Sequence, residues 1–199
     1  MVQTEHELPI HQHRRRLLEG MAHAVAAKGY RDTTIADVVR EAAVSRRTFY
    51  EHFDTKSDCL IALYEAASHN GLKVLRGAID PNHEWQAQLE SALSAYLASM
   101  AENPKLLRTL FIEILGMGFE GLAVRRRVNE AFADFVLTVA NRGRSAGDEG
   151  EALSAEMAMA IVGGINELVL QYIEEDRVPR LQELVRPASQ LVRAVTQQR

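Results

Sequence analysis

Residues 33–56 read TTIADVVREAAVSRRTFYEHFDTK, and this stretch decides how the N-terminal part of the chain folds. Thr34 with Asp37 fits a capping box, in which each residue satisfies a backbone N–H of the other at a helix start. Ser45 is a natural N-cap, because its hydroxyl accepts a backbone N–H three residues further on. The sequence therefore predicts two short helices joined by a tight turn, at about 35–42 and 46–52.

The second of these helices is predicted to have one buried and one exposed face. Phe49 and Phe53 stand four residues apart, so both point to the same side of a helix and are expected to be buried together. The outward face then carries Arg46, Arg47 and Tyr50, with Thr48 and His52 on its flanks. Arginine can donate two hydrogen bonds to guanine, and threonine can contact a thymine methyl group or a base edge. Such a helix is suited to the major groove of DNA.

The remainder of the chain is also predicted to be helical. Apolar residues recur at three- and four-residue spacing, and neither alternating β-branched runs nor Asn-Gly hairpins occur. The fold class is therefore all-α, with about nine helices. Residues 1–10 are expected to form a loose tail and 142–150 a polar loop, and Asp80-Pro81-Asn82 is the candidate domain boundary. The longer predicted helices are 13–28, 56–76 (which starts at a further capping box, Thr55 with Asp58), 84–101, 104–115, 121–141 and two C-terminal helices, the last of which either kinks or begins at Pro187.

Charge and cysteine content narrow the class of protein. The net charge of −4 does not by itself indicate nucleic-acid binding. Residues 1–56 carry nine basic and eight acidic side chains, a net charge of +1, which leaves −5 for the remainder. Cys59 is the only cysteine, so an intrachain disulfide is impossible and a reducing, cytoplasmic compartment is expected. Neither a signal peptide nor a continuous apolar run long enough for a membrane span is recognisable.

Several short motifs in the first 60 residues together resemble one family. They are Gly29-Tyr30, Thr33-Thr34, Ile35-Ala36, Ala42-Ala43-Val44-Ser45, Thr48-Phe49-Tyr50-x-His52-Phe53 and Lys56. This segment, about residues 13–60, is similar to the N-terminal signature of the TetR family of transcriptional regulators. The rest of the chain resembles that family only in length and helical layout.

The resemblance implies a homodimer with one helix-turn-helix per subunit, which binds a roughly palindromic operator on double-stranded DNA and is usually a repressor. Residues 1–56 would be the arm and DNA-binding domain, helix 57–76 the connector, and 81–199 the effector-binding and dimerisation domain. Arg46, Arg47 and Thr48 become candidates for reading bases, and Tyr50, His52, Lys56 and Thr34 for contacting phosphates. The family often has a small residue where Arg47 stands, so the operator of another member should not be transferred to this chain.

The resemblance also implies that the C-terminal half binds an unknown small molecule and a second subunit. An apolar lining with few polar groups would favour a lipophilic or amphipathic effector. The candidate ligand-binding residues are Trp85, Tyr96, Met100, Phe111, Phe119, Phe135 and Asn166. The candidate dimer-interface residues, which would also serve as internal core, are Met157, Ile161, Gly164, Leu168, Leu184, Leu191 and Val195.

Two other classes of protein are alternatives to a DNA-binding regulator. An enzyme is disfavoured, because the chain has no phosphate-binding loop, no G-x-S-x-G elbow and no H-E-x-x-H motif. Cys59, near a helix start, is either a reactive thiolate or, as we favour, a small packing residue. No cofactor or metal site is predicted. A helical interaction protein that does not bind DNA remains the alternative. Replacing Arg46 and Arg47 with alanine would separate the two classes, because only a regulator would lose operator selectivity.

Overall fold

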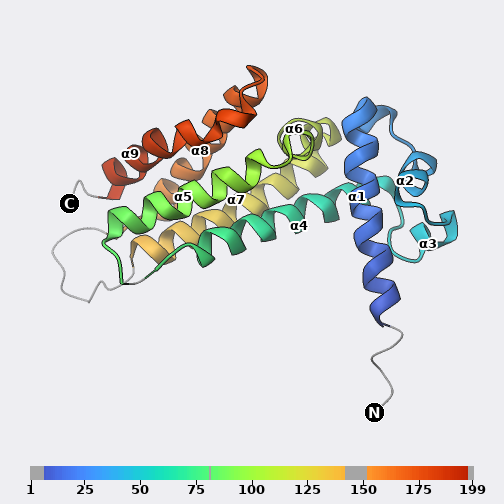
Figure 1. Cartoon of the computed structure of the whole chain (residues 1–199), viewed down its shortest axis with the longest axis horizontal. Helices are drawn as coiled ribbons and strands as arrows, with labels where there is room; N and C mark the ends of the chain where they lie inside the picture. The colour runs from blue at the N-terminus through green and yellow to red at the C-terminus, as the bar shows by residue number, and fades with distance from the viewer. Residues whose placement is uncertain (1–6, 81, 142–151, 197–199) are drawn as a thin grey trace, which may run out of the picture. The chain divides into compact units, whose positions relative to one another are not determined.

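The computed structural model describes residues 7–80, 82–141 and 152–196. Within them the chain forms nine α-helices and two short 3-10 segments and no strand, as expected of an all-α protein (Figure 1). The loop predicted at 142–150 and the first six residues of the predicted tail lie outside the described residues. No helix within the described ranges is long and apolar enough to cross a membrane.

The N-terminal helices follow the caps read from the sequence. Their bounds are α1 Glu7–Asp32, α2 Ile35–Ala42, α3 Arg46–Tyr50 and α4 Lys56–Gly77. The expectation of a tail up to residue 10 was wrong in part, because α1 already begins at Glu7. The predicted stop at Gly29 is seen as a break inside α1, where Gly29 has φ +78° and its neighbours on both sides are helical. Only glycine adopts that backbone region without strain.

The later helices are shorter or shifted relative to the prediction. They are α5 Trp85–Ala101, α6 Pro104–Phe111, the 3-10 segment η1 Glu113–Met117, α7 Phe119–Ala140, α8 Ala155–Glu174, the 3-10 segment η2 Val178–Leu184 and α9 Val185–Thr196. Pro187 is the third residue of α9, so that helix begins there and does not kink. A proline in the first turn is tolerated because its missing N–H would have no partner within the helix.

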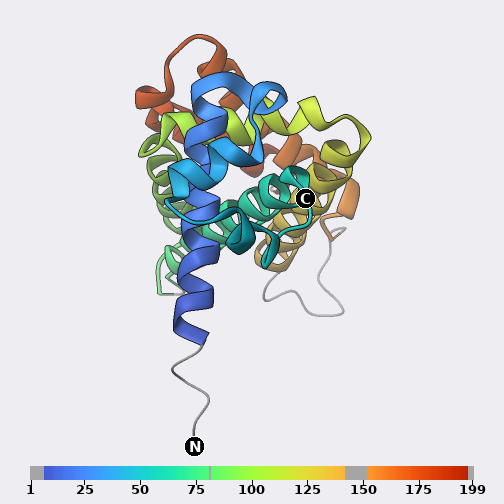
Figure 2. The same ribbon diagram turned by 90° about the vertical axis from the view of Figure 1, so that its right-hand side faces the viewer.

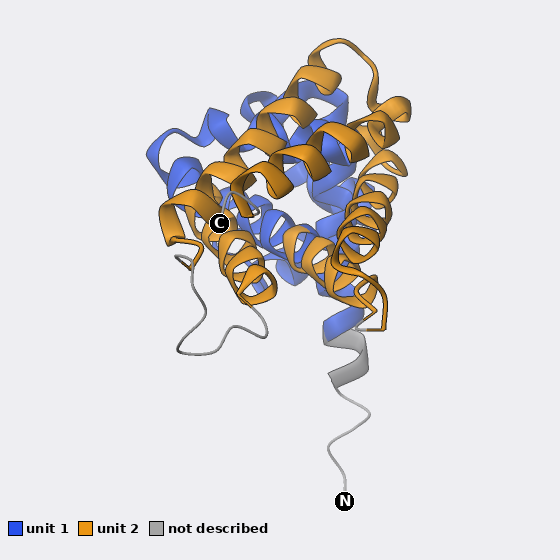
Figure 3. Ribbon diagram, turned by 90° about the vertical axis from the view of Figure 1, so that its left-hand side faces the viewer, with its two compact units in different colours: residues 1–67, 105–124 blue, residues 68–104, 125–199 orange. Residues whose placement is uncertain are grey.

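The chain divides into two compact units that alternate along the sequence (Figure 3). Unit 1 comprises residues 1–67 and 105–124, and unit 2 comprises 68–104 and 125–199. The helices α4 and α7 each run without interruption from one unit into the other. The domain boundary predicted near residue 81 separates a DNA-binding part from an effector-binding part. It is a division by role and not by packing, and it remains a prediction.

Each unit has its own apolar core. In unit 1 the core side chains come from α1 and the two short helices, and they include Leu17, Met21, Val38 and Phe49, all with no measurable exposure. In unit 2, residues from α5, α7, α8 and α9 pack around the buried Ala158 and Ile161. Burial of these side chains is the main stabilising contribution to both units.

Candidate nucleic-acid interface and apolar pocket

All three predicted helix caps are confirmed. Thr34 and Asp37 form a reciprocal box, with Asp37 N donating to Thr34 Oγ1 at 3.3 Å and Thr34 N donating to the Asp37 carboxylate at 2.9 Å. Thr48 N donates to Ser45 Oγ at 3.0 Å at the start of α3. The box at 55–58 is present in the same reciprocal form. Such short-range caps define where each helix begins and therefore how the helices are oriented.

The helices α1 and α2 cross (Figure 2), and a glycine permits their close approach. A Cβ atom on Gly20 would lie 2.7 Å from the carbonyl oxygen of Val38 and 2.8 Å from the amide nitrogen of Ala42. Ala43 then turns the chain with a left-handed conformation, φ +49°, and its carbonyl accepts a hydrogen bond from Arg16 Nη2 at 2.6 Å. The turn between α2 and α3 is thus fixed from both sides.

The predicted buried face of α3 is confirmed. Phe49 is fully buried and Phe53 is 6% exposed, and their ring centroids lie 5.8 Å apart. Tyr50 on the other side is 55% exposed. The burial of the two phenylalanines anchors a helix of only five residues, which would not be stable alone. The regular helix ends at Tyr50, two residues before the predicted end.

The two arginines of α3 differ in their surroundings. Arg46 is exposed and makes no hydrogen bond or ion pair within the described residues. Arg47 is 89% exposed but its Nε donates to Glu51 Oε1 at 3.1 Å, one turn along. Arg46 is therefore free to donate to a base edge, whereas Arg47 must first leave or share its carboxylate partner.

Lys56 makes hydrogen bonds to the backbone that the sequence did not predict. Its Nζ donates to the backbone carbonyls of Tyr30, Arg31 and Thr33 at 2.9, 3.1 and 2.8 Å. It also lies 4.5 Å from the centroid of the Tyr30 ring. An ammonium group has three N–H donors, so all of them are engaged in holding the turn between α1 and α2. A phosphate contact by Lys56 stays a prediction.

Two further predicted phosphate contacts are also engaged in local structure. The Thr34 hydroxyl donates to Asp37 Oδ2 at 2.7 Å while it caps α2. His52 is half-buried, and this burial, followed by its electrostatic interaction with the nearby His13 and Arg14, lowers the pKa of its imidazole. His52 is thus a neutral hydrogen-bonding group at physiological pH rather than a cation.

Asp37 is the centre of a charged network that the sequence pattern did not indicate. Its side chain is 9% exposed and lies 2.6 Å from Lys28 Nζ and 3.0 Å from Arg40 Nη2. The hydrogen bond from Lys28, followed by those from Thr34, holds the pKa of this carboxyl well below its usual range. The network joins α1 to α2. Lys28 lies nine positions before Asp37, too far for any cap motif to reveal the pair.

Glu113 also has a contact that was not predicted for it. The Tyr30 amide, which follows the break at Gly29, donates to Glu113 Oε2 at 2.8 Å. A Cβ atom on Gly29 would lie 3.4 Å from the same oxygen. The break in α1 leaves the Tyr30 N–H without a partner in its own helix, and Glu113 of η1, in the same unit, accepts its hydrogen bond.

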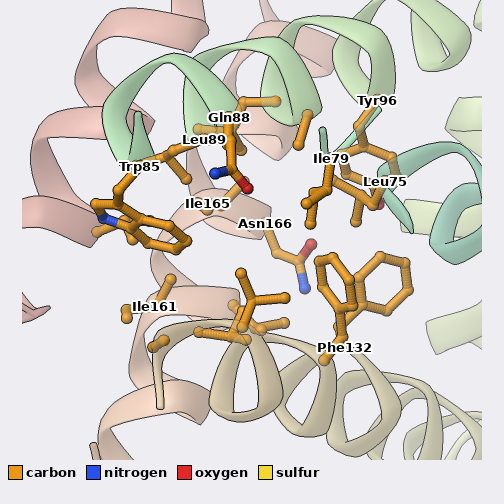
Figure 4. Close-up of a pocket in the computed structure, with 18 residues that line it drawn as sticks. Leu75, Ile79, Trp85, Gln88, Leu89, Tyr96, Phe132, Ile161, Ile165 and Asn166 are labelled. Atoms are coloured by element: carbon orange, nitrogen blue, oxygen red, sulfur yellow. The ribbon is translucent and has the colours of Figure 1, made fainter. Parts of the chain in front are cut away.

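Unit 2 contains an apolar pocket (Figure 4). Its lining comes from the end of α4, from Ile79 just after that helix, and from α5, α7, α8 and α9. Of the residues predicted to bind a ligand, four line it: Trp85, Tyr96, Phe135 and Asn166. Met100 and Phe111 do not line it, and Phe119 is 92% exposed on the surface. The pocket brings together four of the seven candidates, and the ligand-binding role of all seven remains a prediction.

The pocket has few polar groups. Gln88 on α5 and Asn166 on α8 point their amide groups into it, and every other lining residue except Tyr96 and Trp85 is wholly apolar (Figure 4). Asn166 Nδ2 donates to Asn129 Oδ1 at 3.1 Å, which fixes the orientation of the Asn166 side chain. No charged side chain lines the cavity, whose volume is about 80 Å³. Gln88 was missed because a lone glutamine among apolar residues has no distinctive sequence signal.

The residues predicted to form a dimer interface differ in exposure. Ile161 and Leu184 are buried within the single chain, with 1% and 3% exposure. A Cβ atom on Gly164 would lie 3.0 Å from Leu191 Cδ2, so this glycine permits a close approach inside the chain. Met157 is 42% exposed. Leu168, Leu191 and Val195 are half-buried and, with Met157, are the members of the set accessible to a partner.

Cys59 is a packing residue. It is fully buried, its Sγ lies 3.8 Å from the carbonyl oxygen of Leu17, and burial raises the pKa of its thiol to about 12. A thiol with that pKa is protonated at physiological pH and is a poor nucleophile. Across the described part of the chain, no three His, Cys, Asp or Glu side chains are grouped so as to hold a metal ion.

Comparison with known proteins agrees with the geometry of the helix-turn-helix. Residues 17–63 match the family model for bacterial regulatory proteins of the tetR family. This matched segment, which contains the helix-turn-helix, is thus similar to the N-terminal part of tetR-family regulators. A 165-residue stretch of the chain is 20% identical to the fatty acid metabolism regulator protein of Bacillus subtilis (strain 168), covering 81% of this chain and 84% of that protein.

Solved structures of TetR-type regulators share the fold. The fatty acid degradation regulator FadR from Bacillus halodurans superposes with a TM-score of 0.78 at 20% identity, over 89% of this chain and 96% of that one. FadR from Bacillus subtilis, solved in complex with stearoyl-CoA, gives a TM-score of 0.77 at 18% identity over the same shares. The match at residues 17–63 and the shared fold thus agree with the helix-turn-helix geometry, and the described part of the C-terminal region is all-helical as well.

Proposed function

We propose that this protein is a cytoplasmic homodimeric repressor that binds a palindromic operator and leaves it when an acyl chain, carried as a coenzyme A thioester, enters the apolar pocket. The observation that carries the proposal is the composition of the pocket, which is apolar over nearly its whole lining and has no charged residue. The similarity to a fatty acid metabolism regulator and to a FadR structure containing stearoyl-CoA supports the same effector class.

The chemistry of the lining favours a neutral acyl derivative over a free fatty acid. A carboxylate buried among Leu75, Trp85 and Ile165 would have no compensating cation, and burying an unpaired charge is strongly unfavourable. A thioester carbonyl is uncharged and needs only a hydrogen-bond donor. The amide groups of Gln88 and Asn166 supply such donors, and the charged nucleotide portion of the ligand would remain outside the pocket.

The volume of the pocket supports a mechanism for release. A cavity of about 80 Å³ is smaller than the ~300–1,000 Å³ typical of ligand sites. Binding would therefore favour a conformation in which the lining helices are further apart. A ligand shifts an equilibrium only if it binds the two conformations with different affinities. An acyl chain that fits only the wider pocket would bind the wider conformation more tightly.

The helix α4 connects the pocket with the DNA-binding helices. Leu75, near its C-terminal end, lines the pocket, and Lys56, its first residue, donates to three carbonyls of the turn before α2. A displacement at Leu75 can therefore alter the orientation of α3 through one continuous helix. Repression, as opposed to activation, rests on the usual behaviour of TetR-like regulators.

The test begins with selection of bound sequences from random duplex DNA, which is expected to return a palindrome. Operator affinity of the full-length protein is then measured by fluorescence anisotropy with stearoyl-CoA, free coenzyme A or stearate added. We expect stearoyl-CoA alone to weaken operator binding at least tenfold. Stearoyl-CoA that binds tightly but leaves operator affinity unchanged would overturn the proposed release.

Substitution of Arg46 tests the DNA-binding part separately. Arg46→Ala should lower operator affinity by ~1–3 kcal/mol and relax sequence preference at one position of each half-site. Arg76→Ala, which removes another exposed positive charge, from the last turn of α4, is the matched control. Equal losses in the two variants would mean that Arg46 reads no base.

A further inference from the structure

Two aromatic rings close one end of the apolar pocket (Figure 4). Tyr96 is the last lining residue of α5, and Phe132 is the first lining residue of α7. Their ring centroids lie 5.6 Å apart with 48° between the ring planes. Pairs at this separation attract each other beyond the burial of their surfaces, so the two rings support one another.

The Tyr96 ring rests directly on the backbone of α4. A Cβ atom on Gly71 would lie 2.8 Å from Tyr96 Cε2 and 3.5 Å from Phe132 Cζ. Any side chain at position 71 would therefore push the Tyr96 ring away from α4. Gly71 lies in the interior of a helix, where glycine is unfavourable relative to alanine, and this close approach is a physical reason for it.

The opposite end of the pocket is formed by Trp85 and Gln88, next to the exposed residues 82–84. Along α5 the lining extends from Trp85 to Tyr96, which corresponds to about 16 Å at ~1.5 Å per residue. A flexible chain that enters beside Trp85 and follows α5 therefore meets the Tyr96 ring head-on. One turn further on the same face of α5 lies Met100, which does not line the pocket.

We infer that Tyr96, seated on Gly71 and supported by Phe132, sets the maximum length of the acyl chain that this protein accepts. The inference rests on the proposed function, because it presupposes an acyl ligand in this pocket. Each additional methylene buried on the entry side of the ring strengthens binding roughly fourfold. Once the chain reaches Tyr96, a further methylene has no apolar space to enter, and the gain stops.

Opposite changes at this end should move the limit in opposite directions. Tyr96→Leu removes the ring and opens the space toward Met100, so the limit moves to longer chains. Gly71→Ala displaces the ring toward the pocket, so the limit moves to shorter chains. Tyr96→Phe keeps the ring and removes only the hydroxyl, and should leave the limit unchanged.

The experiment measures binding of full-length protein to saturated acyl-coenzyme A thioesters from octanoyl to eicosanoyl by isothermal titration calorimetry. The expected wild-type result is affinity that rises roughly fourfold per methylene to a break and then levels off or falls. Tyr96→Leu should bind chains beyond the wild-type break at least tenfold more tightly than wild type does. Leu89→Ala, which widens the middle of the pocket, is the matched control and should change all affinities without moving the break.

The outcomes separate the inference from the proposed function. No binding of any thioester by the wild-type protein would overturn the proposed effector. Wild-type binding with the same break in Tyr96→Leu, or with the break moved by Tyr96→Phe, would overturn only the role of the ring. Circular dichroism of the free proteins verifies that each variant folds. If Gly71→Ala does not fold, Tyr96→Trp replaces it as the variant expected to move the limit to shorter chains.

Discussion

The DNA-binding helices and the apolar pocket are held together by different kinds of contact. Around α2 and α3, polar side chains hold the backbone over short distances: caps at Thr34 and Ser45, and the three carbonyls bound by Lys56. The pocket instead has walls from several helices, and the side chains that line it are almost all apolar. The first arrangement fixes one orientation of a recognition helix. The second relies on apolar contacts that impose no fixed donor–acceptor geometry, which suits the change of width in the proposed release.

The largest effect is expected where the DNA-binding helices cross most closely. Gly20→Ala would place a methyl group 2.7 Å from the Val38 carbonyl oxygen. Overpacking against backbone costs about 3 kcal/mol, offset in part by ~1 kcal/mol of helix propensity, so we expect a net loss of about 2 kcal/mol in the free energy of unfolding. Urea denaturation measures it. Gly77→Ala, where nothing lies within 4 Å, is the control and should be neutral or slightly stabilising.

Lys56 is expected to have the next largest effect, and two roles can be separated there. Lys56→Ala leaves the carbonyls of Tyr30, Arg31 and Thr33 without their donor, and we expect a loss of about 1–2 kcal/mol in stability. A phosphate contact would in addition lower the slope of log affinity against log salt concentration by about one unit. A stability loss with an unchanged salt slope would assign Lys56 to the turn alone.

Sequence reasoning succeeded where contacts are short-range. The caps at residues 34, 45 and 55 connect groups three positions apart, so a single stretch of chain specifies them. The burial of Phe49 and Phe53 follows from helix periodicity in the same way. These contacts are encoded locally, and the helix-turn-helix was therefore predictable almost residue by residue.

The pocket was predicted less well because its geometry depends on how distant helices rotate. Phe119 illustrates this. Gly121 rests on η1, where a Cβ atom would lie closest to the carbonyl oxygen of Ile114. Phe119 precedes Gly121 by two residues, about 200° around the helix, and so it faces solvent. The glycine, not the aromatic residue, sets the rotation of α7, and no local pattern shows which carbonyl it will meet.

A pH dependence should distinguish the polar contacts of the DNA-binding helices from the apolar pocket. The pKa of Asp37 is lowered in the folded state, so its stabilising contribution is fully present above its ordinary pKa of 3.8 and is lost as the pH falls through the lower, folded value. Asp37→Asn should lower the melting temperature at neutral pH. The further drop in melting temperature on acidification should be smaller in this variant than in the wild type. Asp54→Asn, at an exposed aspartate, is the control. Identical acid profiles in wild type and Asp37→Asn would contradict this role.

The smallest effect on stability, and the most specific effect on function, is expected at Glu51. The Arg47–Glu51 pair is exposed and contributes only about 0.3–0.5 kcal/mol to stability. Glu51→Ala releases the Arg47 guanidinium, so an Arg47 that reads a base should then bind its preferred operator more tightly relative to operators changed at that base. Glu41→Ala removes an exposed carboxylate from α2, beside Arg40, and controls for the general gain in attraction to DNA. Competition binding with a panel of operator variants gives the two selectivity profiles. If both variants strengthen binding equally on every operator, Arg47 contacts no base, and selectivity on α3 depends on Arg46 and Thr48, whose side chains need not leave a carboxylate to reach DNA.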